Sequence, residues 1–255
     1  GVDLDYPSFV HTVLVEMRAR LRSSGRPNRI FEATLAMAKA AGLVGRKRVL
    51  DSTALYDAVA TQDTVTLIRG SIRALLAQVE PDLATLLREV LKRDDDYTAP
   101  GKPRCDWDDA AAREALVDAL AHDAFAVLLA LDKLKLSPAV AQAAALVASV
   151  VGQDIEERSD GLFAIARRVA PDRVISVVDP EARHGHKTAA RGFDGYKGHI
   201  AVDPDSEVIT ATEVTAGNAG EGSVAKTLLV DILADVPQVT SEQQPSERCE
   251  VYGDA

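Results

Sequence analysis

The sequence is short of cysteine and of aromatic residues, and it has no long apolar run. Its two cysteines, Cys105 and Cys249, lie too far apart for a disulfide framework or a paired-cysteine metal site. No stretch of about eighteen apolar residues could form a transmembrane helix. The first residues, GVDLDYPSFV, lack the basic and apolar regions of a signal peptide. These absences exclude a membrane protein and a disulfide-stapled secreted domain, and they favour a protein of the cell interior.

The charge is acidic overall but unevenly distributed. The net charge of −10 argues at first against a nucleic-acid partner. Between His11 and Arg48, however, the sequence has nine Lys and Arg residues and only two Asp and Glu residues. From Ile200 to Ala255 it has two basic and eleven acidic residues. This arrangement would suit an anion-binding element beside a metal site, but ordinary surface charge is the simpler explanation.

Apolar periodicity predicts a chain that is helical first and β-rich afterwards. Helices are expected at about residues 8–24, 28–41, 54–80, 82–93 and 108–152. Strands are expected at residues 47–53, 172–178, 196–202 and 207–215, with a helix at 222–234 and a last strand in RCEVYGDA. The sequence DPDS joins the strands at 196–202 and 207–215, and it predicts an antiparallel hairpin.

The segment RVLDSTALYDAVATQDT, residues 48–64, has two interpretations. A strand-like run ends in Asp51 and a helical pattern follows, so Asp51 is either the N-cap of that helix or a carboxylate displayed at a strand end. The order strand, hairpin, helix and strand is that of an RNase H-like core, in which the first and last of these strands lie parallel and adjacent. Their ends would bring Asp51 and Asp254 together, an arrangement that is costly unless a divalent cation neutralises it.

Three long strings resemble the DDE transposases of bacterial insertion sequences. They are RVLDSTALYDAVATQDTVTLIRGSIRALL, APDRVISVVDPEARHGHKTAARGFDGYKGHIAVDPDSEVITATEVTAGNAGEG and VYGDA. The resemblance is closest to the group with a helical insertion after the first catalytic strand. It implies an α/β fold, with a C-terminally incomplete RNase H-like core over residues 47–255, interrupted by a helical insertion at 81–152. Residues 1–46 would be the C-terminal part of a helical DNA-binding region. The motif Gln62-Asp63-Thr64 also looks characteristic, without an evident chemical role.

The resemblance also implies the site residues. Asp51 and Asp254 match the first two catalytic aspartates and would hold Mg²⁺ or Mn²⁺. The family's third carboxylate, a Glu on a later helix, has no counterpart, so we expect this chain to be truncated and inactive as a fragment. Glu221 occupies a position where the family often has Asp, and we do not count it as a ligand. Asp179, which ends the expected strand at 172–178, is a weaker alternative to Asp51 as the first ligand.

Basic residues outside the acidic site are candidates for contact with DNA phosphates. The candidates are Arg18, Arg20, Arg22, Arg183, Lys187, Arg191 and Lys197. For the first three, a solvated helix face is an equally good explanation. His184 and His186, two residues apart with no Cys partner, form only a weak zinc signal, and a solvated loop or phosphate contact is the simpler reading.

The function that the resemblance implies is DNA transposition. Metal-dependent cleavage at the ends of an insertion sequence would be followed by strand transfer to target DNA. The partners would be double-stranded DNA and a second copy in a homodimer on DNA, with no membrane, in the bacterial cytoplasm at the nucleoid. The alternative is a non-catalytic DNA-binding remnant that competes with an intact transposase. A helical interaction protein with no nucleic-acid role is a third reading, which leaves the strand-terminal aspartates unexplained.

Overall fold

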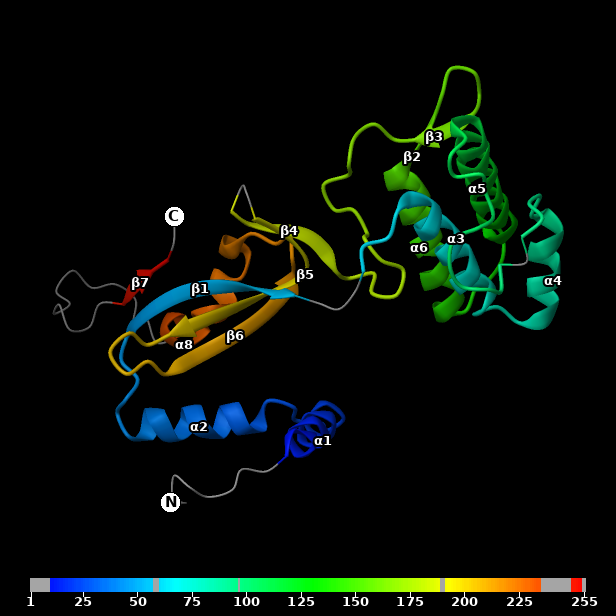
Figure 1. The fold of residues 1–255 in the computed structure, drawn as a ribbon. Helices are drawn as coiled ribbons and strands as arrows, with labels where there is room; N and C mark the ends of the chain where they lie inside the picture. The colour runs from blue at the N-terminus through cyan, green and yellow to red at the C-terminus, as the bar shows by residue number, and fades with distance from the viewer. Residues whose placement is uncertain (1–9, 57–59, 96, 189–190, 235–248, 254–255) are drawn as a thin grey trace. The chain divides into compact units, whose positions relative to one another are not determined.

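The structure is a computed structural model, and it describes residues 10–56, 60–95, 97–188, 191–234 and 249–253 (Figure 1). The chain is mixed α/β, as the sequence predicts, and it divides into two compact units. The first unit comprises residues 1–52, 199–213 and 221–255, and the second comprises residues 53–198 and 214–220.

The first unit combines short helices with the strand that carries Asp51. Its elements are α1 (His11–Arg22), α2 (Arg29–Ala40), β1 (Lys47–Tyr56) as far as Ser52, η1 (Glu221–Ser223), α7 (Ala225–Leu228), α8 (Val230–Leu233) and β7 (Glu250–Tyr252). Residues of α1 and α2 are exposed or half-buried. A small core of Ala201, Val224 and Leu228, with Leu50 and Ala211 packed against it, lies under β1.

The pairing of β1 with β7 is parallel, as the sequence predicts for the first and last strands. Lys47 lies opposite Glu250, and Val49 lies opposite Tyr252. In the sheet the strand order is β4 (Arg183–Thr188), β5 (Arg191–Val202), β1 and β7, and β6 (Ile209–Ala216) pairs with β5. The sheet is therefore mixed, with one parallel pair beside the antiparallel pair of β4 and β5.

The hairpin expected from the sequence is present. Strands β5 (Arg191–Val202) and β6 (Ile209–Ala216) are joined by a turn that Asp203 organises. The buried carboxylate of Asp203 accepts hydrogen bonds from the backbone N–H groups of Asp205 and Ser206, both at 3.0 Å. Burial raises the pKa of Asp203, but the hydrogen bonds from Gly45, Ser206 and Asp205 outweigh it and hold the pKa below its usual value.

The second unit is built around a helical core. Its helices are α3 (Thr64–Leu76), α4 (Pro81–Val90), α5 (Ala110–Leu131) and α6 (Pro138–Asp154). Fully buried residues such as Leu67, Leu75, Leu120, Val127 and Val147 bring α3, α5 and α6 together. The strands β2 (Ile155–Glu157) and β3 (Phe163–Ile165) form a small separate antiparallel sheet. Among the described residues, no helix is both apolar and long enough to cross a membrane.

Several expected element bounds are wrong. The helix expected from Ala54 starts only at Thr64, because β1 continues to Tyr56 and Asp63 caps the helix. Residues 172–178 form no strand, whereas residues 183–188, expected as a loop, form β4 (Arg183–Thr188). The helix expected at 222–234 is broken into η1, α7 and α8.

Candidate functional site

Asp51 lies within β1, with its side chain on the exposed side of the strand. Side chains alternate between the two faces of a strand, and Arg48 and Leu50 lie on the face opposite to Asp51. On that face Arg48 is buried and Leu50 is half-buried against the small core. Its Oδ1 atom accepts a hydrogen bond from the backbone N–H of Ser52 at 2.7 Å. The strand continues past Asp51 to Tyr56, so the helix-cap interpretation of Asp51 is wrong. Asp51 is a carboxylate displayed on a strand.

Asp51 lines a small hollow of about 180 Å³ in the first unit. Leu50, Val224, Ala225 and Leu228 form the apolar part of its lining. The polar part consists of Asp51, the buried His199 and Glu221, together with the backbone of Gly222 and Gly253. The hollow therefore combines two carboxylates with one imidazole.

Glu221 is the residue of this site that reasoning from the sequence discounted. It begins η1, and its Oε1 atom accepts a short hydrogen bond from the hydroxyl of Ser52, the residue after Asp51. The signal was present in the sequence, because Glu221 stands where the resembling family often has Asp. The structure brings this residue and Asp51, which are 170 positions apart in the chain, into one hollow.

The second expected aspartate, Asp254, lies outside the described residues. The described part of the strand before it, β7, is parallel to β1 and ends at Tyr252, and Gly253 lines the hollow. Within the described part of the chain, no group of three or more His, Cys, Asp or Glu residues could hold a metal ion. The described donors of this hollow that suit Mg²⁺ are the carboxylate oxygens of Asp51 and Glu221. Mg²⁺ takes one or two carboxylates and keeps several of its waters, so these donors fit it.

Asp179, the weaker alternative to Asp51, has a different environment. It lies in the loop before β4, and its Oδ1 atom accepts a hydrogen bond from the hydroxyl of Tyr196 at 2.7 Å. It is not among the residues that line the hollow around Asp51.

The basic candidates fall into two groups. Arg18, Arg20, Arg22, Lys187 and Arg191 are exposed. By contrast, the side chains of the other two basic candidates are engaged within the second unit. Arg183 Nε donates to Asp172 at 2.8 Å, and Lys197 Nζ donates to the carbonyl of Ala219 at 3.0 Å.

His184 and His186 stand on β4 with their rings 4.9 Å apart, edge to face. The Nδ1 atom of His184 is 2.7 Å from Oδ1 of Asp194, and Oδ2 of Asp194 accepts a short hydrogen bond from the hydroxyl of Thr61. Burial raises the pKa of Asp194, but the hydrogen bonds from Thr61 and His184 outweigh this effect and hold the pKa below its usual value. The imidazole of His184 is therefore engaged with the carboxylate of Asp194.

The comparisons with known proteins give one match. The family model of the transposase DDE domain matches residues 165–255, which contain the hairpin, η1, the short helices and β7. No curated protein and no solved structure is significantly similar to the chain. Domains of this family generally use divalent metal ions, and the family indicates DNA transposition, with DNA as the substrate. Residues 165–255 are therefore similar to a transposase DDE domain.

Proposed function

We propose that this chain is part of a transposase that cleaves a DNA phosphodiester at the ends of an insertion sequence and joins the freed 3′-OH to target DNA, with an RNase H-like core as the catalytic part. The parallel pairing of β1 with β7 carries the proposal. Val49 lies opposite Tyr252, and Asp51 and Asp254 each follow two residues later in the sequence. An RNase H-like core uses this kind of pairing to bring two carboxylates to one edge of its sheet.

Asp51 and Asp254 are the proposed ligands of Mg²⁺ or Mn²⁺, with Glu221 beside Asp51 in the same hollow. The ions, when bound, would activate the attacking oxygen and stabilise the leaving oxygen of an in-line displacement. The short hydrogen bond from Ser52 holds the Glu221 carboxylate at the wall of the hollow. Negative charge from Glu221 would then favour a cation next to Asp51.

Exposed arginines of α1 support contact with DNA. Arg18, Arg20 and Arg22 are all exposed, and Arg20 lies 3.9 Å from the carboxylate of the exposed Glu16. Such a pair contributes little, so these guanidinium groups are available for phosphates. Lys187 and Arg191 would add contacts from the β4–β5 hairpin. In this proposal residues 1–46 belong to a DNA-binding region, residues 47–255 to the core with its insertion at 81–152, and two copies pair on DNA.

The proposal is tested by calorimetric titration of the chain with Mn²⁺. We expect Asp51→Ala and Asp254→Ala each to weaken binding at least about tenfold, because each removes a charged ligand. The matched control is Asp205→Ala, since Asp205 is an exposed aspartate in the hairpin turn. Binding that survives Asp51→Ala would overturn the proposed role of Asp51.

A second experiment separates catalysis from DNA binding. Supercoiled DNA carrying the element's ends is incubated with the chain in Mn²⁺, and nicking is followed on gels. Nicking that Asp51→Ala abolishes supports the enzyme. Salt-dependent DNA binding that Arg18→Ala and Arg22→Ala weaken, without nicking by the parent chain, favours the non-catalytic DNA-binding remnant instead.

A further inference from the structure

Strand β4 carries a pair of histidines that the proposed chemistry does not use. His184 and His186 are two residues apart, so both side chains lie on the same face of the strand. Both residues are exposed, and their rings are 4.9 Å apart at 90° to each other. Because zinc–nitrogen bonds are about 2.0–2.1 Å long, two imidazoles on one ion have ring centroids roughly 5 Å apart. The observed spacing therefore suits one shared metal ion.

Strand β5 leaves space beside both rings. In the antiparallel pairing of β4 with β5, His186 lies opposite Gly192. A Cβ atom at Gly192 would lie 2.9 Å from Cε1 and 3.1 Å from Nε2 of His184, and 3.6 Å from Cε1 of His186. One edge of each ring therefore faces the place where Gly192 has no side chain.

Asp194, which lies opposite His184 on β5, fixes the tautomer of this histidine. The pKa of Asp194 is held below its usual value, so the carboxylate is ionised at neutral pH and can only accept hydrogen bonds. Nδ1 of His184, 2.7 Å from Oδ1, therefore carries the proton, while Thr61 donates to Oδ2. The lone pair of the neutral imidazole is then on Nε2. A carboxylate behind a histidine is the usual arrangement at metal sites, because it orients the ring and makes Nε2 more basic.

We propose that His184 and His186 bind one divalent transition-metal ion of the class that prefers imidazole ligands, such as Zn²⁺, Cu²⁺ or Ni²⁺. Asp194 positions His184, and water completes the coordination. Two protein ligands are fewer than the four of a structural zinc site, so this site is open to solvent. The imidazole ligands differ in kind from the carboxylate oxygens of Asp51, which suit Mg²⁺ or Mn²⁺, and the inference does not rest on the proposed function.

Calorimetric titration with Zn²⁺ tests the site. The buffer holds excess Mg²⁺, which competes for carboxylate sites and has little affinity for imidazole. We expect His184→Asn and His186→Asn each to weaken Zn²⁺ binding about tenfold or more, since even the loss of a residue that only orients a ligand costs about 10–100-fold. Asp51→Ala should leave this Zn²⁺ affinity unchanged.

Variants of Asp194 separate positioning from ligation. Asp194→Ala should weaken Zn²⁺ binding about 10–100-fold. Asp194→Asn should lose less, because the amide oxygen can still accept the hydrogen bond from Nδ1 of His184. Equal affinity of Asp194→Ala and the parent would overturn the positioning role.

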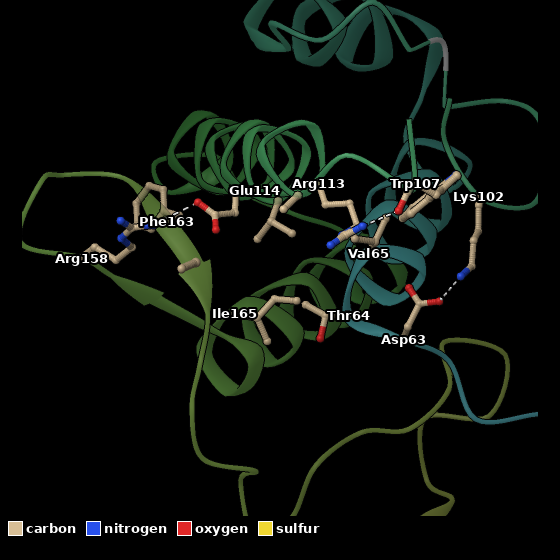
Figure 2. A pocket seen from close by; sticks show the side chains of 13 residues that line it. Asp63, Thr64, Val65, Lys102, Trp107, Arg113, Glu114, Arg158, Phe163 and Ile165 are labelled. Atoms are coloured by element: carbon tan, nitrogen blue, oxygen red, sulfur yellow. Dashed lines mark hydrogen bonds and ion pairs between the residues drawn. The ribbon is translucent and has the colours of Figure 1, made fainter. Parts of the chain in front are cut away.

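The matched control is His122→Asn. His122 is also an exposed histidine, and it lies 3.4 Å from the carboxylate of Asp118. Its ring is 4.9 Å from the ring of Phe163, which lines the cavity of about 520 Å³ that Figure 2 shows. His122 thus has a carboxylate beside it but a phenyl ring where His184 has a second imidazole. The control should bind Zn²⁺ as the parent does.

Electron paramagnetic resonance of the parent chain with one equivalent of Cu²⁺ counts the imidazole ligands without any substitution. Coupling to two imidazole nitrogens is the expected result. Coupling to one or none, no Zn²⁺ binding by the parent, or parental Zn²⁺ affinity in both histidine variants would overturn the inference. The two histidines belong to the second unit and Asp51 belongs to the first. Mn²⁺ binding that depends on Asp51 would therefore persist if the histidine site failed, so the two failures are distinguishable.

Discussion

The carboxylate of Asp63 accepts a hydrogen bond from the backbone N–H of Thr66 at 2.9 Å, and this bond starts helix α3. The helix that follows β1 is therefore capped twelve residues after Asp51. Asp51 has no role in starting a helix, so its carboxylate is available for chemistry. The two aspartates of one short segment thus have separate roles, one structural and one displayed on the strand.

These separate roles predict different effects on stability. Asp63→Ala should lower the free energy of unfolding by about 0.5–2 kcal/mol, because α3 loses its N-cap. Asp51→Ala should change it by less than about 0.5 kcal/mol, since an exposed side chain is removed. Urea unfolding followed by circular dichroism measures both values. A larger loss in Asp51→Ala than in Asp63→Ala would contradict this assignment.

The sequence predicted most helices and the hairpin, because each has a local pattern that packing did not override. The parallel pairing of β1 with β7 was predicted from the order of the elements along the chain. The family resemblance is confirmed over residues 165–255. The roles of Asp51 and Asp254 as metal ligands stay predictions. Glu221 was discounted because it stands where the family often has Asp. Its proximity to Asp51 depends on tertiary contacts that local sequence does not encode.

Residues 172–178 show why a β-rich segment formed no strand. Glutamine side chains, rather than a neighbouring strand, bind the backbone of this segment. Gln153 pairs with both backbone groups of Val174, at 2.8 and 3.0 Å, and Gln62 accepts from the N–H of Val177 at 2.9 Å. Val174 and Ile175 are still buried, whereas Val178 is 78 % exposed, and several hydrogen bonds of the segment have glutamine side chains as partners, which periodicity cannot reveal.

The same contacts give the Gln62-Asp63-Thr64 motif a structural role. Gln62 holds the segment at 172–178, Asp63 caps α3, and the hydroxyl of Thr64 donates to Asp154 at 2.9 Å in a buried pair with Arg173. All three side chains therefore fix the start of α3 against the segments around it.

Gln62→Ala should accordingly destabilise the chain. The variant leaves the N–H of Val177 without its amide partner, and an unsatisfied backbone donor costs about 1–3 kcal/mol when it is buried. Gln78→Ala, which alters an exposed glutamine after α3, is the control and should be nearly neutral. Thermal and urea unfolding provide the comparison. Equal stability of the two variants would show that water replaces the Gln62 amide.

Arg69 and Asp95 predict a pH dependence of stability. The guanidinium of Arg69 bonds both carboxylate oxygens of Asp95, at 2.7 and 2.8 Å, and holds the pKa of Asp95 below its usual value, although burial opposes this. In the unfolded chain the pKa of Asp95 is about 3.9. The stabilisation is therefore present above about pH 4 and is lost as the pH falls through the folded-state pKa.

Asp95→Asn tests this dependence. At neutral pH the variant should be less stable than the parent, and the difference should narrow as the pH falls below about 4. Urea midpoints measured across the acid range give the difference directly. Other aspartates with lowered pKa values, such as Asp203, contribute equally to the stability of parent and variant, so their contributions cancel in the difference. A difference independent of pH would mean that Asp95 stabilises the turn without its charge.

Arg48 anchors β1 three residues before Asp51. The side chain is 1 % exposed, and its Nη2 atom donates to Asp231 of α8 at 2.7 Å. Its Nη1 atom donates to the carbonyls of Gly45 and Lys47 and lies 3.6 Å from the buried Asp203. One guanidinium thus connects β1 to α8 and to the turn of the hairpin.

Arg48→Met should therefore cost about 3–5 kcal/mol, because it removes the cation beside the buried Asp203 and leaves Asp231 with only Lys39, at 3.6 Å. Lys47→Met is the matched control at the neighbouring position. It breaks only an exposed pair with Asp205 at 3.7 Å and should cost less than about 1 kcal/mol. If Arg48 also positions the strand that displays Asp51, Asp231→Ala should weaken Mn²⁺ binding in protein that remains folded. Unchanged Mn²⁺ affinity in that variant would restrict Arg48 to a role in stability.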